Sequence, residues 1–198
     1  MSLSLTERTA WTSLAVGLFV LSLKGVAWWI TGSTAFFAEM LETVVNVAAA
    51  SAALMAVRYS AMPADDNHPY GHAKAEYFSA VLEGALIVVA ATLILQEVWT
   101  AWQNPRAPDR PMIGLVLSIA AALVNVVWAT ILRRRGKRLG SPALVADSHY
   151  LMADVVTSVG VVIGVFLVTV TGLLWLDPLM AGVTAVMICL LYTSPSPR

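Results

Sequence analysis

Two acids and an amide interrupt an otherwise apolar stretch of the chain. Glu39, Glu42 and Asn46 lie 3, 4 and 7 residues apart, so their side chains share one face of a helix. A carboxylate at membrane depth is costly, and by default it marks an ion or proton path. This face is therefore the first candidate for chemistry.

A second polar face with the same spacing occurs farther along the chain. Asp147, Tyr150 and Asp154 again lie 3, 4 and 7 residues apart. His149 does not share this face, because it stands about 140° around the helix from Asp154. Two separate segments thus each present a polar triplet near the start of an apolar run.

These two faces predict an ion site if they meet. Four oxygen-bearing side chains would then surround one point: Glu42, Asn46, Tyr150 and Asp154. Such a set suits a divalent cation. The alternative is a pair of interhelical hydrogen bonds that only hold the helices together. The acids favour the ion site, since membrane carboxylates are seldom purely structural.

A third group of candidate ligands lies in the polar segment 63–76. Asp65, His68 and His72 place one carboxylate and two imidazoles within eight residues, a ligand set that suits zinc. Loop histidines are common, so this segment alone is only a weak indication of a metal site.

The composition shows what kind of scaffold must position these groups. Hydrophobic residues make up 59% of the 198 residues and charged residues 12%, and the mean hydropathy is +0.77. A soluble domain carries about twice that share of charge. The formal net charge of zero gives no indication of nucleic-acid binding, and one cysteine allows no disulfide framework. No nucleophile–base pair or cofactor motif indicates an enzyme.

The apolar runs predict an all-α membrane protein, a bundle of six transmembrane helices of about 20 residues each. The expected helices are 9–30, 33–59, 77–102, 111–132, 144–170 and 176–188. Longer polar breaks are expected at 60–76 and 133–142.

The positive charges predict the orientation of this bundle. Lys and Arg gather in the two long breaks, and Arg8 precedes the first helix. If the helices alternate in direction, these charges share one side, which the positive-inside rule assigns to the cytoplasm. We therefore expect a cytoplasmic N-terminus and a bacterial inner-membrane location. Lys24 is expected to extend its side chain to the opposite interface.

With all three stretches considered together, the chain resembles the cation diffusion facilitator family. The resemblance runs from about residue 28 to 188, and its most specific part is Pro-Ala-Asp-Asp-Asn-His-Pro-Tyr-Gly-His-Ala-Lys-Ala-Glu at 63–76. It implies a transporter that moves divalent metals such as Zn, Mn or Fe out of the cytoplasm in exchange for protons. The metal would lie between the second and fifth helices, at the four positions named above, with a loop site at Asp65, His68 and His72.

Two of the four positions depart from the family pattern. Asn46 lacks a carboxylate charge, and Tyr150 replaces a histidine. His149 is one residue away and would need a local π-bulge to face the site. An oxygen-only ligand set suits Mn²⁺ or Fe²⁺ better than zinc, so we expect weaker zinc selectivity than in members with a His/Asp pair.

The missing histidine also affects proton exchange, because that histidine is the usual proton carrier in the family. Here protons would load on Glu42 or Asp154. Glu39, Asp147 and His149 are possible accessory groups, with Glu39 as a proton relay or an acid behind the ligands.

The last ten residues, Cys189 to Arg198, read Cys-Leu-Leu-Tyr-Thr-Ser-Pro-Ser-Pro-Arg, which is unlike the end of a membrane helix. The stretch resembles the translation of a sequencing adapter, so we expect a transmembrane domain at 1–188 and a non-native tail at 189–198. The family's cytoplasmic C-terminal domain, which binds metal and supports a homodimer, would then be absent. An alternative function is a non-transporting subunit of the same fold that dimerises with a competent relative and regulates it.

Overall fold

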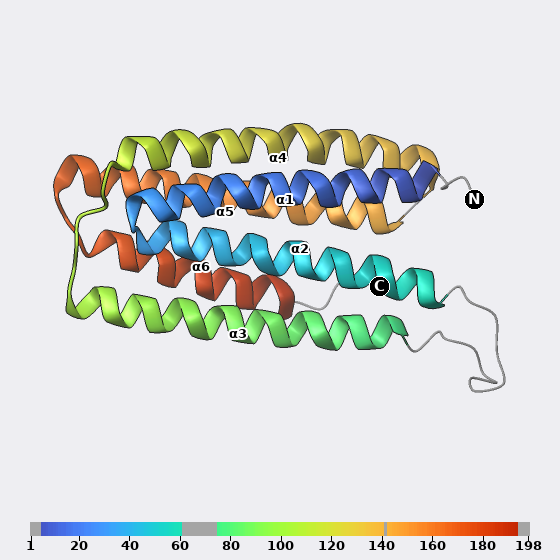
Figure 1. Cartoon of the computed structure of the whole chain (residues 1–198), viewed down its shortest axis with the longest axis horizontal. Helices are drawn as coiled ribbons and strands as arrows, with labels where there is room; N and C mark the ends of the chain where they lie inside the picture. The colour runs from blue at the N-terminus through green and yellow to red at the C-terminus, as the bar shows by residue number, and fades with distance from the viewer. Residues whose placement is uncertain (1–4, 61–74, 141, 194–198) are drawn as a thin grey trace.

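The computed structural model describes residues 5–60, 75–140 and 142–193, and within these ranges it contains six α-helices and no strand. The helices are α1 (Leu5–Thr31), α2 (Thr34–Ser60), α3 (Ala75–Gln103), α4 (Pro111–Leu139), α5 (Pro142–Thr171) and α6 (Leu176–Thr193). They run up and down along one long bundle (Figure 1). The predicted all-α six-helix fold is confirmed.

The distribution of side chains is that of a membrane protein. Five helices are long and apolar enough to cross a bilayer, and α6 contains a shorter apolar run, Leu176–Leu190. Large apolar side chains such as Trp29, Val81 and Val170 are exposed on the outside, whereas Lys24 is 1% exposed in the interior. Lipid can cover such an apolar exterior, and helices satisfy their own backbone groups there. The chain is an integral membrane protein.

Two helix ends differ from those predicted. The break expected at 133–142 is helical as far as Leu139, because Arg and Lys favour helices and can extend α4 beyond its apolar part. Gly140, at φ 61°, ends the helix with a backbone N–H directed at the carbonyls of Gly136 and Lys137. The sixth helix continues to Thr193 instead of ending near residue 188. The non-native tail stays a prediction.

The N-terminus of α2 is capped by a carboxylate from α6. Ser33 Oγ accepts a hydrogen bond from the Phe36 N–H at 3.3 Å. Asp177 accepts hydrogen bonds from Ser33 Oγ at 2.6 Å and from the Thr34 N–H at 2.7 Å. Unpaired N–H groups at a helix start favour a negative charge. This cap therefore ties the start of α2 to the start of α6.

The helices form two sets that meet at a seam. In the first set, α1 and α5 both pack on α4. In the second set, α2, α3 and α6 pack on one another. Figure 1 shows the first set above the second. The sets meet where α2 lies against α1 and α5, and where α5 lies against α6. The two polar faces singled out in the sequence belong to α2 and α5, one on each side of this seam.

Candidate functional site

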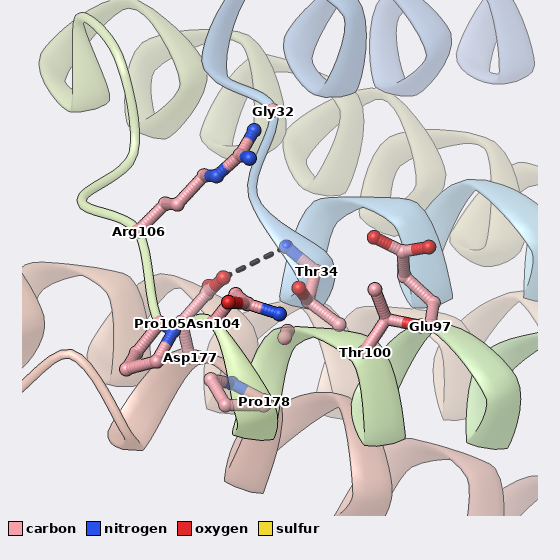
Figure 2. Close-up of a pocket in the computed structure, with 10 residues that line it drawn as sticks. Gly32, Thr34, Glu97, Thr100, Asn104, Pro105, Arg106, Asp177 and Pro178 are labelled. Carbon is pink, nitrogen blue, oxygen red and sulfur yellow. Dashed lines mark hydrogen bonds between the residues drawn. The ribbon is translucent and has the colours of Figure 1, made fainter.

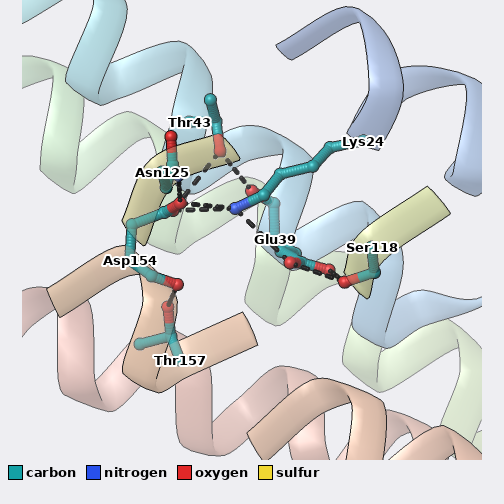
Figure 3. A network of polar contacts seen from close by, with 7 residues as sticks. All are labelled: Lys24, Glu39, Thr43, Ser118, Asn125, Asp154 and Thr157. Atoms are coloured by element: carbon teal, nitrogen blue, oxygen red, sulfur yellow. Dashed lines mark hydrogen bonds and ion pairs between the residues drawn. The ribbon is translucent and has the colours of Figure 1, made fainter. Parts of the chain in front are cut away.

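A buried ion-pair network crosses the seam, and Lys24 of α1 stands at its centre (Figure 3). The Lys24 Nζ lies 2.8 Å from both carboxylate oxygens of Asp154 on α5. It also lies 3.4 Å from Oε1 of Glu39 on α2. The expectation that Lys24 reaches the membrane interface is therefore wrong. Buried carboxylates hold the ammonium inside the bundle, where charge pairing replaces the water it has lost.

Asp154 is held by donors from three further helix positions. The Asn125 amide on α4 donates to one carboxylate oxygen at 2.6 Å, and the Thr43 hydroxyl on α2 lies 3.4 Å from the other. One turn along α5, the Thr157 hydroxyl donates to the backbone carbonyl of Asp154 at 2.9 Å. Asp154 is only 2% exposed. Its carboxylate is consequently both desolvated and fully hydrogen-bonded, as a buried charge requires.

Glu39 is fixed across the seam by α4. The Ser118 hydroxyl lies 2.9 Å and 3.0 Å from the two Glu39 oxygens, so its single proton is shared between them. Both side chains are buried. Glu39 thus has two partners in the first helix set, Ser118 and Lys24.

Glu42 is the third carboxylate of the network. It is buried, and it is close enough to Asp154 and Lys24 to interact electrostatically with both. Its Oε2 has no hydrogen-bond partner among the described residues, and the same holds for Asn125 Oδ1 and Ser158 Oγ. Unpaired buried oxygens are costly and rare. These three atoms, on α2, α4 and α5, each keep unused capacity to accept a hydrogen bond.

The structure divides the four side chains predicted to form the ion site. Glu42 and Asp154 belong to one buried network, as described. Asn46 is only half-buried, and Tyr150 is 43% exposed. His149 is exposed as well. The buried part of the site therefore consists of carboxylates, and its remaining polar groups come from α1 and α4.

Asp147 takes part in a separate cluster within the first helix set. The Ser13 hydroxyl on α1 donates to Asp147 at 2.7 Å, and the Trp128 indole on α4 donates to Ser13 Oγ at 3.1 Å. These contacts join α1, α4 and α5. The cluster lies about 10 Å along α5 from Asp154, at the 1.5 Å rise per residue of a helix.

The network in this conformation is arranged around an ammonium and not around a metal ion. Within the described ranges, no three His, Cys, Asp or Glu side chains converge closely enough to hold a metal. The described network nevertheless combines three buried carboxyl groups with a single ammonium. The loop residues Asp65, His68 and His72 lie outside the described residues.

Sequence reasoning singled out the three acids of this network and did not place its five other side chains there. Lys24 was the available signal, because the rule that singles out a carboxylate at membrane depth applies equally to a lysine inside an apolar run. Asn125 in α4 could be found in the same way as Asn46 in α2. Ser118, Thr43 and Thr157 give no signal, since hydroxyl side chains are common in membrane helices and usually bond their own backbone.

A polar pocket of about 220 Å³ lies at the end of the bundle where α2 begins (Figure 2). Its walls come from the α1–α2 turn, the end of α3 with its following link, and the start of α6. Glu97, Thr34 and Asn104 line it, together with Asp177 of the α2 cap. No residue of the ion-pair network lines it, so the two polar regions are separate features.

Fold and network together define a class: a helical membrane protein with ionisable groups buried between two helix sets. Such groups in membrane proteins line ion, proton or substrate paths. The family model of the cation efflux transmembrane domain matches residues 10–193. The chain belongs to the cation efflux family.

Curated relatives agree with this assignment. Over 181 residues the chain is 48% identical to the "Uncharacterized transporter sll1263" of Synechocystis sp., covering 91% of this chain and 58% of that protein. It is 31% identical over 151 residues to the cation-efflux pump FieF of Escherichia coli, covering 76% and 50%. The corresponding pump of Cronobacter sakazakii is 29% identical over 163 residues, covering 82% and 54%. The chain thus spans about half the length of these relatives.

Proposed function

We propose that this chain is the membrane domain of a divalent-cation exporter and that the buried network around Asp154 is its transport site. The observation that carries the proposal is the excess of carboxyl groups buried at the seam, three against one ammonium, where movement between two helix sets would expose them to either side. With all three carboxyl groups ionised, one divalent cation neutralises such a site. The names of the relatives, which include cation-efflux pumps, support the same direction of transport.

The proposed ligands are oxygen atoms. Glu42 and Asp154 supply carboxylates, and Asn46 and Tyr150 would join them in a conformation that closes around the ion. Oxygen ligands suit Mn²⁺ and Fe²⁺ better than zinc. The proposed substrates are therefore Mn, Fe and Zn, with Mn and Fe preferred over Zn. A second metal site is proposed in the loop, at Asp65, His68 and His72.

The proposed cycle is proton antiport. The site opens to the cytoplasm, a cation binds, and protons leave Glu42 or Asp154. The helix sets then rock, and protons from the far side displace the cation. We place the N-terminus in the cytoplasm of a bacterial inner membrane, from the Lys and Arg distribution, and we propose a homodimer as the working unit.

The test is metal-driven proton flux in everted vesicles that contain the full-length protein. Zn²⁺, Mn²⁺, Fe²⁺ and Cd²⁺ are added in turn, while a pH-sensitive dye reports the gradient. Asp154→Asn should reduce flux by at least roughly tenfold, because loss of even an indirect partner of a metal costs about 10–100-fold. The matched control is Asp109→Asn, which alters an exposed acid in the α3–α4 link and should leave flux unchanged.

Two results would contradict the proposal. Flux that survives Asp154→Asn would move the transport site elsewhere, and metal flux without any change in the pH gradient would remove proton antiport. Absence of flux with every metal, from folded protein, would favour the regulatory subunit. The observation behind that second candidate is Lys24, which already occupies the carboxylate that a transported cation would need.

A further inference from the structure

The Lys24 ammonium occupies the carboxylate that the proposed function assigns to the cation. We propose that Lys24 is a built-in competitor of the transported cation, which can bind Asp154 only after the ammonium has moved away. This inference rests on the proposed function, and it assigns a role in that function to a residue of α1.

The contacts of Asp154 show why both cations cannot bind at once. The ammonium lies 2.8 Å from each carboxylate oxygen, so it bridges the pair. Asn125 at 2.6 Å and Thr43 at 3.4 Å approach the remaining sides. Two carboxylate oxygens offer about four acceptor positions, and these contacts fill them. A divalent ion would need one of those positions and would also face the positive charge of Lys24.

The network offers the ammonium a second partner. Glu39 Oε1 lies 3.4 Å from Lys24 Nζ, farther than the Asp154 oxygens. Ser118 holds the Glu39 carboxylate in place from α4. A small movement of the long lysine side chain therefore transfers the ammonium from Asp154 to Glu39. In this scheme Glu39 receives the lysine and does not bind the metal.

Departure of the ammonium frees acceptor positions on Asp154 for the incoming cation. Asp154 loses two contacts, and Glu42 Oε2, Asn125 Oδ1 and Ser158 Oγ have no partner among the described residues. Hard divalent cations bind carboxylate, amide and hydroxyl oxygens of this kind. The exchange conserves buried charge pairing, because Lys24 keeps one carboxylate in each state.

A static counter-ion would make different predictions from a competitor. The experiment measures Mn²⁺ affinity in purified full-length protein, counting only the binding that Asp154→Asn abolishes, which leaves the loop site out. Lys24→Met/Glu39→Gln removes one positive and one negative charge, so the buried network keeps its net charge. This variant should bind Mn²⁺ about tenfold more tightly, as expected if the lysine-occupied form holds about nine-tenths of the molecules.

Two conservative variants test the exchange in the opposite direction. Lys24→Arg should weaken Mn²⁺ binding, because a guanidinium grips both oxygens of a carboxylate in a fixed fork. Glu39→Gln alone should also weaken it, because the ammonium loses its second partner. Glu39→Gln alone should thus weaken Mn²⁺ binding, whereas Lys24→Met/Glu39→Gln should tighten it. Opposite effects of this kind show an energetic coupling between the two residues that a purely structural ion pair would not produce.

The outcomes separate this inference from the proposed function. Wild-type protein without any Asp154-dependent Mn²⁺ binding would contradict the transport site itself. Asp154-dependent binding that is unchanged or weaker in Lys24→Met/Glu39→Gln would overturn the competitor role alone. If that double variant does not fold, Lys24→Arg decides, and unchanged affinity there overturns the competitor role.

Discussion

Lys24 and Asp154 form a buried ion pair in the interior, with the Lys24 Nζ 2.8 Å from both carboxylate oxygens. Both are at most 2% exposed. Breaking a buried ion pair by removing one partner typically costs about 3–5 kcal/mol. An apolar pair of similar size would fill the same space with a smaller desolvation penalty. The charges at the seam therefore lower the stability of the fold, and the proposed transport function gives a reason for them.

Tyr150 is the residue that should set metal preference. It lies one turn before Asp154 on α5, and in the closed conformation proposed above Tyr150→His would add a nitrogen ligand beside the carboxylates. Nitrogen ligands favour zinc over Mn²⁺ and Fe²⁺. We expect the variant to shift competition in Asp154-dependent flux toward zinc relative to Mn²⁺, measured with both metals present.

The control for this prediction is His149→Ala, which changes the neighbouring exposed side chain on another part of the helix surface. It should leave the zinc-to-manganese ratio unchanged. Wild-type protein that already prefers zinc by orders of magnitude would contradict the reasoning from the oxygen-only ligand set.

Spacing alone singled out the three acids of the network, Glu39, Glu42 and Asp154. It could not predict their partners, because a hydrogen bond from Asn125 or Ser118 depends on which helices become neighbours. Lys24 was misjudged for a related reason. A lysine near the end of an apolar run can reach water in one packing arrangement and an acid in another.

At the scale of the helices, α5 and α6 approach each other closely at one glycine. A Cβ added to Gly164 would overlap the Cγ of Met180 on α6, with the Met180 sulfur at 3.2 Å and its Cβ at 3.3 Å. At Gly160, one turn earlier, the nearest Met180 atom is at 3.7 Å, an ordinary contact. Of Gly160 and Gly164, only Gly164 is therefore critical for this contact.

Gly164→Ala should destabilise the protein by about 1–3 kcal/mol, the usual cost of overpacking an interior. Gly160→Ala is the matched control and should be neutral or slightly stabilising, since alanine is the better helix former. Thermal unfolding in detergent, followed by loss of helical circular dichroism, measures both variants. Equal unfolding temperatures for the two would show that the α5–α6 contact is looser than described.

The existence of the helices could be predicted well, because each apolar run is long enough to span a bilayer. The ends of the helices were predicted less accurately. The arginine-rich end of α4 reads as a polar break in the sequence, yet arginine and lysine are good helix formers once the preceding turns are in place.

At the scale of the whole molecule, the seam separates contacts that the proposed alternating access would break from those it would keep. Lys24 to Asp154 and Asn125 to Asp154 lie within the first helix set. Glu39 to Ser118 and Thr43 to Asp154 join the two sets. Rocking of one set against the other would therefore release α2 from the network, while α1, α4 and α5 keep their contacts with one another.

A disulfide across the seam should stop this movement. A Cβ on Gly17 of α1 would lie 3.1 Å from Val47 Cγ2 on α2, close enough for a disulfide between cysteines at these positions. In a Cys189→Ser background, oxidation of Gly17→Cys/Val47→Cys should abolish metal flux, and a reductant should restore it. Vesicle flux before and after oxidation is the measurement.

The control disulfide lies within the first helix set. A Cβ on Gly136 of α4 would lie 3.0 Å from Val145 Cγ2 on α5. Oxidation of Gly136→Cys/Val145→Cys should leave flux at its reduced-state value, because these helices move together. Equal inhibition by both disulfides would mean that the moving parts are divided differently.

The bundle and its number of helices followed from the sequence, but the seam did not. Hydrophobic periodicity does not identify the neighbouring helices of a helix that is apolar on most of its surface. The face-to-face placement of α2 and α5 was an assumption made from two polar triplets, and α1 and α4 entered the network only in three dimensions.

The cap of α2 by Asp177 has a consequence for how the protein is made. The ribosome delivers α2 early, with Glu39 and Glu42, and delivers Asp177 only at the start of α6. Until then Ser33 is the part of the cap already present, and the preceding helix supplies Lys24 as a basic partner for Glu39. The pairing of the first hairpin is therefore completed only when α6 has been made.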